Sequence, residues 1–231
     1  MKVACLFSGG KDSTYALHWA VLQGFRVECL VTLKPARADS WMFHRPCIEL
    51  SKLQSKALGI PIVFMETKGE KERELEDLKL ALKKAIDTYG VGGVVAGALL
   101  SDYQRMRIAL ICEELGLKTY TPIWRRGQEE YMRELVKSGF KVMITSITCY
   151  GLPTSLVGRV LDEGVVEDII RRARKYGFNP AFEGGEAETL VLDAPLFKKK
   201  LIVRGRVKVV SDFEAYYIVE EACLGDKESS A

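Results

Sequence analysis

The feature that most constrains this chain is the regular alternation of apolar segments with segments of helical spacing over its first half. Apolar, β-prone runs occupy residues 1–7, 25–35, 60–67, 92–100 and 117–124. Apolar residues recur every three or four positions in the segments 14–24, 46–59, 70–90 and 103–116. Strands that alternate with helices in this way, and that are apolar along most of their length, are typical of a parallel sheet buried on both faces. The sequence therefore predicts a doubly wound α/β domain with a five-stranded parallel sheet over residues 1–126.

The alternation of apolar runs with segments of helical spacing becomes less regular after residue 126. The pattern there predicts helices over 128–139 and 165–177, strands over 140–147 and 189–197, and a long β-prone tail over 199–224. We expect this tail to form an antiparallel pair with its turn near Arg204 and Gly205. The sequence thus predicts a second, smaller α+β domain over residues 127–231.

Composition excludes several classes of protein. The formal net charge of +3 does not require a nucleic-acid partner. No apolar run approaches the roughly 18 residues that span a bilayer, and the N-terminus is not typical of a signal peptide. The six cysteines are scattered without a CxxC pair, and the histidines are only His18 and His44, so we expect no zinc site. We expect a reduced, cytoplasmic protein without a membrane partner.

The segment "SGGKDS", from Ser8 to Ser13, lies between the first predicted strand and the first predicted helix. In doubly wound sheets the loop after the first strand is a common phosphate site. Gly9 and Gly10 allow backbone N–H groups to approach an anion closely, and the helix adds its positive N-terminal end. The position of the loop favours phosphate binding over a simple tight turn.

The side chains of this loop suit the same ligand. Lys11 would add a formal positive charge, and Asp12 could hold Mg²⁺ that bridges phosphates. Ser8 and Ser13 offer hydroxyl groups. A tight turn that carries a solvated Lys-Asp pair remains the alternative interpretation.

The loop matches neither the Walker A pattern nor the Rossmann pattern. It resembles the SGGxDS loop of the PP-loop, or N-type ATP pyrophosphatase, superfamily, whose fold is adenine nucleotide alpha hydrolase-like. That resemblance implies ATP and Mg²⁺ as cofactors. It also implies that the loop holds the pyrophosphate released when a substrate oxygen attacks the α-phosphorus of ATP. The substrate is left open.

Two longer blocks, Gly97–Arg125 and Glu183–Phe197, closely resemble those of the diphthine-ammonia ligase family and its archaeal relatives, and "MFHRP" around His44 is a weaker match. The resemblance covers nearly the whole chain. It implies amidation of diphthine on translation elongation factor 2, through a carboxyl-adenylate, to give diphthamide, AMP and pyrophosphate. The chain has no room for a glutaminase domain, so free ammonium is the expected nitrogen donor, unless a separate subunit provides it.

Further site residues are expected after the fourth strand and in the loop after the second. The expected nucleotide-binding residues there are His44, Gly97, Ser101, Tyr103, Gln104 and Arg107. We expect Gly97 to stay small so that the nucleotide can approach. Arg105, as a catalytic residue, and Arg107 would bind phosphate or the adenylate through their forked donors. A capped helix with solvated arginines is the alternative interpretation.

An acidic loop, "EGGEAET", places Glu183, Glu186 and Glu188 around two glycines. Its residues alone are equally compatible with a solvated turn. The resemblance favours a site in which Glu186 and Glu188 are catalytic, through the trimethylammonium group of diphthine, the ammonium or a metal. Which of these three groups each glutamate would bind is left open.

Two other functions remain open. One is a PP-loop enzyme that adenylates a different substrate, such as a tRNA base or a small carboxylate. The scattered cysteines disfavour a thiolating enzyme, and the lack of an RNA-binding appendage disfavours an enzyme of the lysidine type, which needs no paired cysteines. The other is a nucleotide-binding module without catalysis, which would have little use for a Lys-Asp pair and an acidic loop. We also expect a homodimer, with the β-rich tail as its interface.

Overall fold

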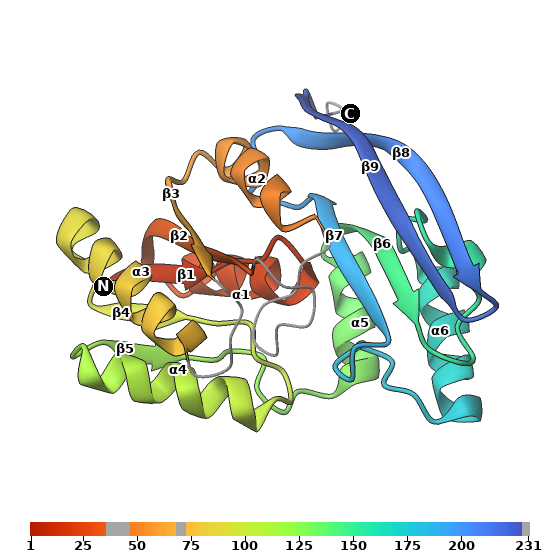
Figure 1. Cartoon of the computed structure of the whole chain (residues 1–231), viewed down its shortest axis with the longest axis horizontal. Coiled ribbons are helices and arrows are strands. Elements are labelled where there is room, and N and C mark those ends of the chain that lie inside the picture. The colour runs from red at the N-terminus through yellow and green to blue at the C-terminus, as the bar shows by residue number, and fades with distance from the viewer. Residues whose placement is uncertain (36–46, 68–72, 228–231) are drawn as a thin grey trace. The chain divides into compact units, whose positions relative to one another are not determined.

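The computed structural model describes residues 1–35, 47–67 and 73–227 (Figure 1). The chain divides into two compact units, Met1–Arg125 and Arg126–Ala231. His44, which the sequence places in the nucleotide site, lies outside the described residues. None of the helices in the described ranges is both long and apolar enough to cross a membrane.

The first unit is built on a parallel sheet, which confirms the predicted doubly wound fold. Its strands are β1 (Lys2–Leu6), β2 (Arg26–Pro35), β3 (Ile62–Thr67), β4 (Gly93–Val95) and β5 (Lys118–Tyr120). Their order in the sheet is β3-β2-β1-β4-β5, and all neighbours are parallel. The chain moves outward from β1 to β3 and then crosses to the other side of β1. The order therefore reverses between β1 and β4, where doubly wound sheets bind their ligands.

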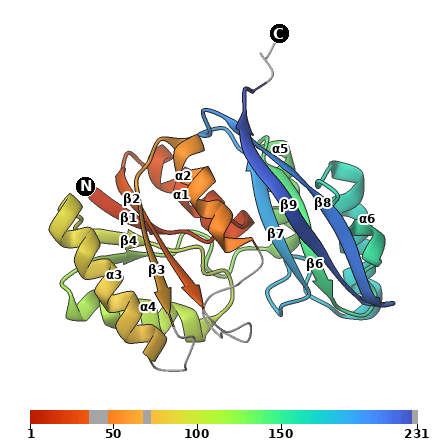
Figure 2. The same cartoon turned by 45° about the horizontal axis from the view of Figure 1, so that its top comes forward.

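Helices cover both faces of this sheet. α3 (Arg73–Tyr89) and α4 (Asp102–Glu114) pack on one face, where Leu78 and Leu82 meet Ile108 and the strand residue Val94 in one buried cluster. α1 (Lys11–Leu22) and α2 (Ser51–Leu58), which follows the 3-10 turn η1 (Ile48–Leu50), lie on the opposite face (Figure 2). Burial on both faces explains why the strands carry almost continuous apolar runs.

The second unit combines helices with an antiparallel sheet, as predicted for the C-terminal part. Its elements are α5 (Gln128–Lys137), β6 (Lys141–Thr148), η2 (Thr154–Leu156), α6 (Glu163–Tyr176), β7 (Ala187–Asp193), β8 (Lys200–Ser211) and β9 (Glu214–Gly225). The strand order is β7-β6-β9-β8. α5 and α6 pack against each other.

The predicted turn near Arg204 and Gly205 is wrong. β8 continues through both residues, and the hairpin turns at Asp212 and Phe213 instead. A register shift between Arg204 and Gly205 marks a β-bulge, and a Cβ on Gly205 would lie 2.0 Å from the carbonyl oxygen of Ile218. Glycine is needed there because the partner backbone approaches closely within the strand, not because the chain reverses.

α6 begins at an aspartate cap that can be tested directly. Asp162 Oδ1 accepts a hydrogen bond of 2.8 Å from the N–H of Val165. We expect Asp162→Ala to lower the free energy of unfolding by about 1 kcal/mol, because it removes the acceptor of a first-turn N–H. Asp162→Asn keeps an acceptor and should stay close to wild type. Urea unfolding followed by circular dichroism measures both, and an alanine variant as stable as wild type would contradict the assignment.

Candidate functional site

The loop between β1 and α1 is braced by its own side chains. Ser13 Oγ accepts from the N–H of Ser8 (3.2 Å), donates to the carbonyl oxygen of Gly10 (3.2 Å) and lies 3.2 Å from Ser8 Oγ. Ser8 Oγ also accepts from the N–H of Gly10 (3.4 Å), and Thr14 Oγ1 donates to the carbonyl of Gly10 (2.9 Å). In this structure the hydroxyls of Ser8 and Ser13 therefore hold the shape of the loop.

The first turn of α1 carries a paired lysine and aspartate. Gly10 is the N-cap residue, in an extended conformation and without a side-chain capping bond. Lys11 Nζ lies 2.8 Å from Asp12 Oδ2, and only 4% of the lysine side chain is exposed, against 25% for the aspartate. Lysine is seldom so buried unless it is paired or functional. The burial of Lys11 argues against the alternative of a solvated Lys-Asp pair on a tight turn.

Gly97 packs directly against the backbone of this turn. A Cβ on Gly97 would lie 2.5 Å from the carbonyl carbon of Asp12 and 2.7 Å from the amide nitrogen of Ser13. Such contacts are far below any that real Cβ atoms make, and backbone atoms cannot move aside cheaply. Gly97 is therefore small because the end of β4 touches the start of α1. This reason differs from the predicted one, which was access for the nucleotide.

The start of α4 presents two arginines on different sides. Ser101 caps the helix by accepting from the N–H of Gln104 (3.3 Å). The Arg105 guanidinium lies 4.6 Å from the ring centre of Trp124, and that of Arg107 lies 3.5 Å from the ring centre of Tyr103. Residues two positions apart on a helix do not face each other, so the two guanidinium groups present different surfaces.

Two residues near this site were missed by sequence reasoning. Trp124 follows β5 and stacks with Arg105, and a tryptophan at the end of a predicted strand is the only hint that the sequence offers. Gln54 on α2 donates from Nε2 to the carbonyl oxygen of Gly9 (2.9 Å). Nothing in the spacing of α2 distinguishes this glutamine from a surface residue, because the contact joins positions 45 residues apart.

The acidic loop, residues 183–189, belongs to the second unit, whereas the Ser8–Ser13 loop, called the phosphate loop below after its predicted ligand, belongs to the first. Glu186 Oε1 accepts from the N–H of Asn179 (2.8 Å), and its Oε2 accepts from the N–H of Gly184 (2.8 Å). Both carboxylate oxygens thus hold the loop that leads into β7. Glu188 lies opposite Ser146 in the β6–β7 ladder and is half-buried. Glu186 is therefore placed to shape the loop, a role that the sequence did not indicate.

Metal binding has one candidate in the phosphate loop. Within the described ranges, no three or more His, Cys, Asp or Glu residues gather in a way that could hold a metal ion. Mg²⁺ in phosphate sites is usually held by one or two carboxylates together with substrate phosphates. Asp12, at the helix start and one-quarter exposed, fits that arrangement.

Three cysteines of the first unit have thiols whose pKa is raised by burial. Burial raises the pKa of Cys29 to about 12 and that of Cys47 to about 11. Burial also raises the pKa of Cys5, which is fully buried in β1. A thiol with a raised pKa is a poor nucleophile at neutral pH. This observation disfavours chemistry that depends on these three thiolates.

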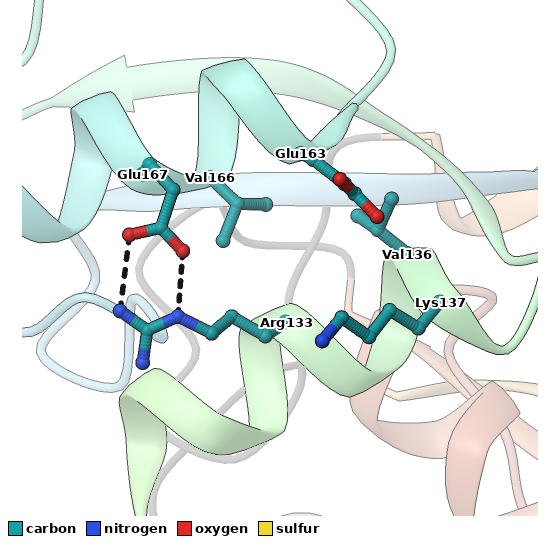
Figure 3. Close-up of a pocket in the computed structure, with 6 residues that line it drawn as sticks. All are labelled: Arg133, Val136, Lys137, Glu163, Val166 and Glu167. Carbon is teal, nitrogen blue, oxygen red and sulfur yellow. Dashed lines mark hydrogen bonds and ion pairs between the residues drawn. The ribbon is translucent and has the colours of Figure 1, made fainter.

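A separate pocket of about 240 Å³ lies between α5 and α6 (Figure 3). Two of the charged residues that line it, Arg133 and Glu167, are paired with each other. Arg133 binds Glu167 in a bidentate manner, with distances of 2.6 and 3.0 Å (Figure 3). Arg174 binds Glu129 in the same way, at 2.8 and 2.5 Å, and Arg133 lies 3.6 Å from Glu129. The network links the two helices and has no evident catalytic role.

This network predicts a pH dependence of stability. The hydrogen bond from Arg133 lowers the pKa of Glu167, and that from Arg174 lowers the pKa of Glu129. A carboxylate with a lowered folded pKa stabilises the fold above its unfolded pKa, near 4.5, and loses this effect as pH falls through the folded value. We expect Glu167→Gln to be less stable than wild type at neutral pH, with a difference that vanishes in acid. Thermal unfolding of Glu167→Gln and wild type, measured from neutral pH into acid, tests this expectation.

The control for that measurement is Glu163→Gln, which changes a carboxylate of the same pocket outside the two bidentate pairs. We expect a smaller destabilisation from it at neutral pH. If the stability difference between Glu167→Gln and wild type stays constant as the pH falls, the lost stability comes from packing and not from the ion pair.

A second prediction concerns Gly97. Gly97→Ala should force β4 and the first turn of α1 apart, lowering the free energy of unfolding by roughly 1–3 kcal/mol. It should also weaken the nucleotide binding that the sequence predicts for the Ser8–Ser13 loop, because that loop moves with the turn. Gly92→Ala is the matched control, since a Cβ there meets nothing within 4 Å. Thermal unfolding and calorimetric titration measure the two effects, and equal behaviour of both variants would refute the packing role.

Comparison with known proteins adds independent evidence. The model of the diphthamide synthase N-terminal domain matches residues 1–119, and that of the diphthamide synthase C-terminal domain matches residues 127–224. The chain is 34% identical over 257 residues to the diphthine-ammonia ligase of Homo sapiens, which covers 100% of this chain and 95% of that protein. It is 33% identical over 238 residues to that of Bos taurus, covering 94% of this chain and 88% of the relative.

A longer relative also matches. The diphthine-ammonia ligase of Schizosaccharomyces pombe is 32% identical over 244 residues, which are 98% of this chain but 40% of that protein. The similarity thus includes both the phosphate loop and the acidic loop in the second unit. On these grounds the chain belongs to the diphthamide synthase family.

Proposed function

We propose that this protein catalyses the ATP-dependent amidation of diphthine on translation elongation factor 2, with ammonium as the nitrogen donor. The products are diphthamide, AMP and pyrophosphate. The names of the relatives support the reaction, since each is a diphthine-ammonia ligase. The structural observation that carries the proposal is the buried lysine paired with an aspartate in the first turn of α1, where the strand order reverses.

The phosphate loop fits the polyphosphate of ATP. The first-turn N–H groups of α1 and the helix dipole favour negative charge, and Lys11 adds a formal positive charge. Gly9 and Gly10 leave no side chain between the backbone and a phosphate. Asp12 is the residue that would hold Mg²⁺, and the ion would supply neutralisation of phosphate charge.

The chemistry explains why these groups are needed. A carboxylate is a poor electrophile for ammonia, because oxide or hydroxide would have to leave. In the proposed route a carboxylate oxygen of diphthine attacks the α-phosphorus of ATP, and the bond to the bridging oxygen of pyrophosphate breaks. Ammonia then attacks the carbonyl carbon of the carboxyl-adenylate; the C–N bond forms, AMP leaves and a proton passes to solvent. Lys11 and the backbone donors stabilise the charge that develops on pyrophosphate.

The remaining residues are assigned by their surroundings. Stacking on Trp124 limits the motion of Arg105, so its donors are preorganised for the charge on the α-phosphate. Arg107 faces another side of α4, and we assign it to nucleotide binding together with Ser101, Tyr103 and Gln104. In the second unit we assign Glu188 to the ammonium or trimethylammonium group and Glu186 to holding the loop.

The test is a turnover assay with the purified protein, Mg-ATP, ammonium chloride and elongation factor 2 that carries diphthine. We expect AMP and pyrophosphate to appear only with the factor, whose mass should change by the exchange of a hydroxyl for an amine. Lys11→Met keeps the buried aliphatic stem but removes the charge, and should slow turnover by about 10²-fold to 10³-fold. Lys84→Met, at an exposed lysine of α3, is the control and should keep the wild-type rate.

Other results would redirect the assignment. Release of AMP with a tRNA or a small carboxylate, but not with the factor, would keep the ATP chemistry and overturn the substrate. ATP binding without release of pyrophosphate would indicate a nucleotide-binding module. Unchanged turnover in Lys11→Met would remove this lysine from the catalytic groups.

A further inference from the structure

Gln54 contacts the phosphate loop from a neighbouring helix. Its side chain is fully buried, and Nε2 donates to the carbonyl oxygen of Gly9 at 2.9 Å. Gly9 has a φ of +82°, and a Cβ on it would lie 2.1 Å from Gln54 Oε1. The amide of Gln54 therefore lies directly against the Gly9 backbone, in space that any side chain at position 9 would occupy.

This hydrogen bond determines which way the next N–H points. The peptide bond between Gly9 and Gly10 is planar and trans, so the carbonyl oxygen and the N–H point in opposite directions. Gln54 holds the carbonyl oxygen toward α2. The N–H of Gly10 consequently points away from α2, toward Ser8 Oγ at 3.4 Å.

The alternative orientation of the same peptide would oppose anion binding. A peptide between two glycines can turn over with little steric resistance, because neither residue has a Cβ. Turning it over would direct a carbonyl oxygen to the side where the N–H now lies. A carbonyl oxygen repels phosphate, whereas an N–H donates to it.

We propose that Gln54 is a positioning residue of the phosphate loop. It orients the Gly9–Gly10 peptide so that the N–H of Gly10, which makes an exposed bond of 3.4 Å to Ser8 Oγ, and not the carbonyl oxygen of Gly9, lies on the side where pyrophosphate would bind. This inference rests on the proposed function, because it takes the loop as the pyrophosphate site. Gln54 itself touches only the protein in this role. The contact accounts for a buried polar side chain on α2 that the chemistry of the reaction does not require.

The test measures the affinity of the full-length protein for inorganic pyrophosphate with Mg²⁺, by calorimetric titration. Gln54→Met is close in shape but lacks the donor, and should weaken pyrophosphate binding about tenfold. Ser55→Ala is the matched control. It removes a partly buried hydrogen bond of the same helix, from Ser55 Oγ to the carbonyl oxygen of Ile60 at 2.6 Å, at the end of α2. This control should lose stability without a change in pyrophosphate affinity.

A second variant separates peptide orientation from a simple loss of stability. Gln54→Glu keeps the shape but, when ionised, offers only acceptors to the Gly9 carbonyl. Protonation of the introduced carboxyl restores an O–H donor, so pyrophosphate affinity relative to wild type should recover as pH falls. A merely structural role would not produce that pH profile. This variant also keeps the inference testable if Gln54→Met fails to fold.

The outcomes are distinguishable. If wild type binds pyrophosphate and both Gln54 variants bind it equally well, the positioning role is overturned and the proposed function stands. The positioning role is also overturned, and the proposed function stands, if Ser55→Ala weakens pyrophosphate binding as much as Gln54→Met does. If wild type binds neither pyrophosphate nor ATP, the proposed phosphate site is overturned and this inference with it.

Discussion

The contact between the end of β4 and the first turn of α1 is the constraint on which the candidate site depends. At Gly97 two backbones meet with no space for a Cβ, so the loop after β1 and the loop after β4 are held side by side. A side-chain contact at this point could relax by changing rotamer, but a backbone contact cannot. The reversal of strand order places the two loops at the same edge of the sheet, and this contact determines how closely they approach.

In each of the two units, polar side chains hold the shape of loops. Ser8 and Ser13 bond to each other and to the backbone, Gln54 holds Gly9, and in the second unit Glu186 holds the backbone of its own loop. Preorganised loops of this kind lose less conformational entropy when an anion binds. These residues hold a loop, whereas Lys11 and Asp12 carry the charges that suit the proposed polyphosphate ligand.

The sequence predicted the sheet well, because burial on both faces gives parallel strands a simple apolar pattern that is visible in residues 1–7 and 25–35. Its error at Gly205 has an equally clear cause. Glycine marks either a turn or a bulge, and only the pairing partner, here Ile218, distinguishes them. The candidate residues from Ser8 to Ser13 could be singled out from the sequence because they are contiguous, and their role in binding stays a prediction. Gln54 and Trp124 were missed because their contacts join distant segments and follow no periodic rule.

Local sequence alone determined the strand-loop-helix unit that begins the chain, the charge pair within it and the cap at Ser101, because these depend on neighbours a few residues apart. The tertiary structure decided what those residues do. In the folded chain Lys11 is buried beside Asp12, and Arg105 and Arg107 lie over different aromatic rings. Gly97 packs against the backbone of α1. Exposure, stacking partners and backbone approach depend on which segments the fold brings together, and no local pattern of residues encodes that information.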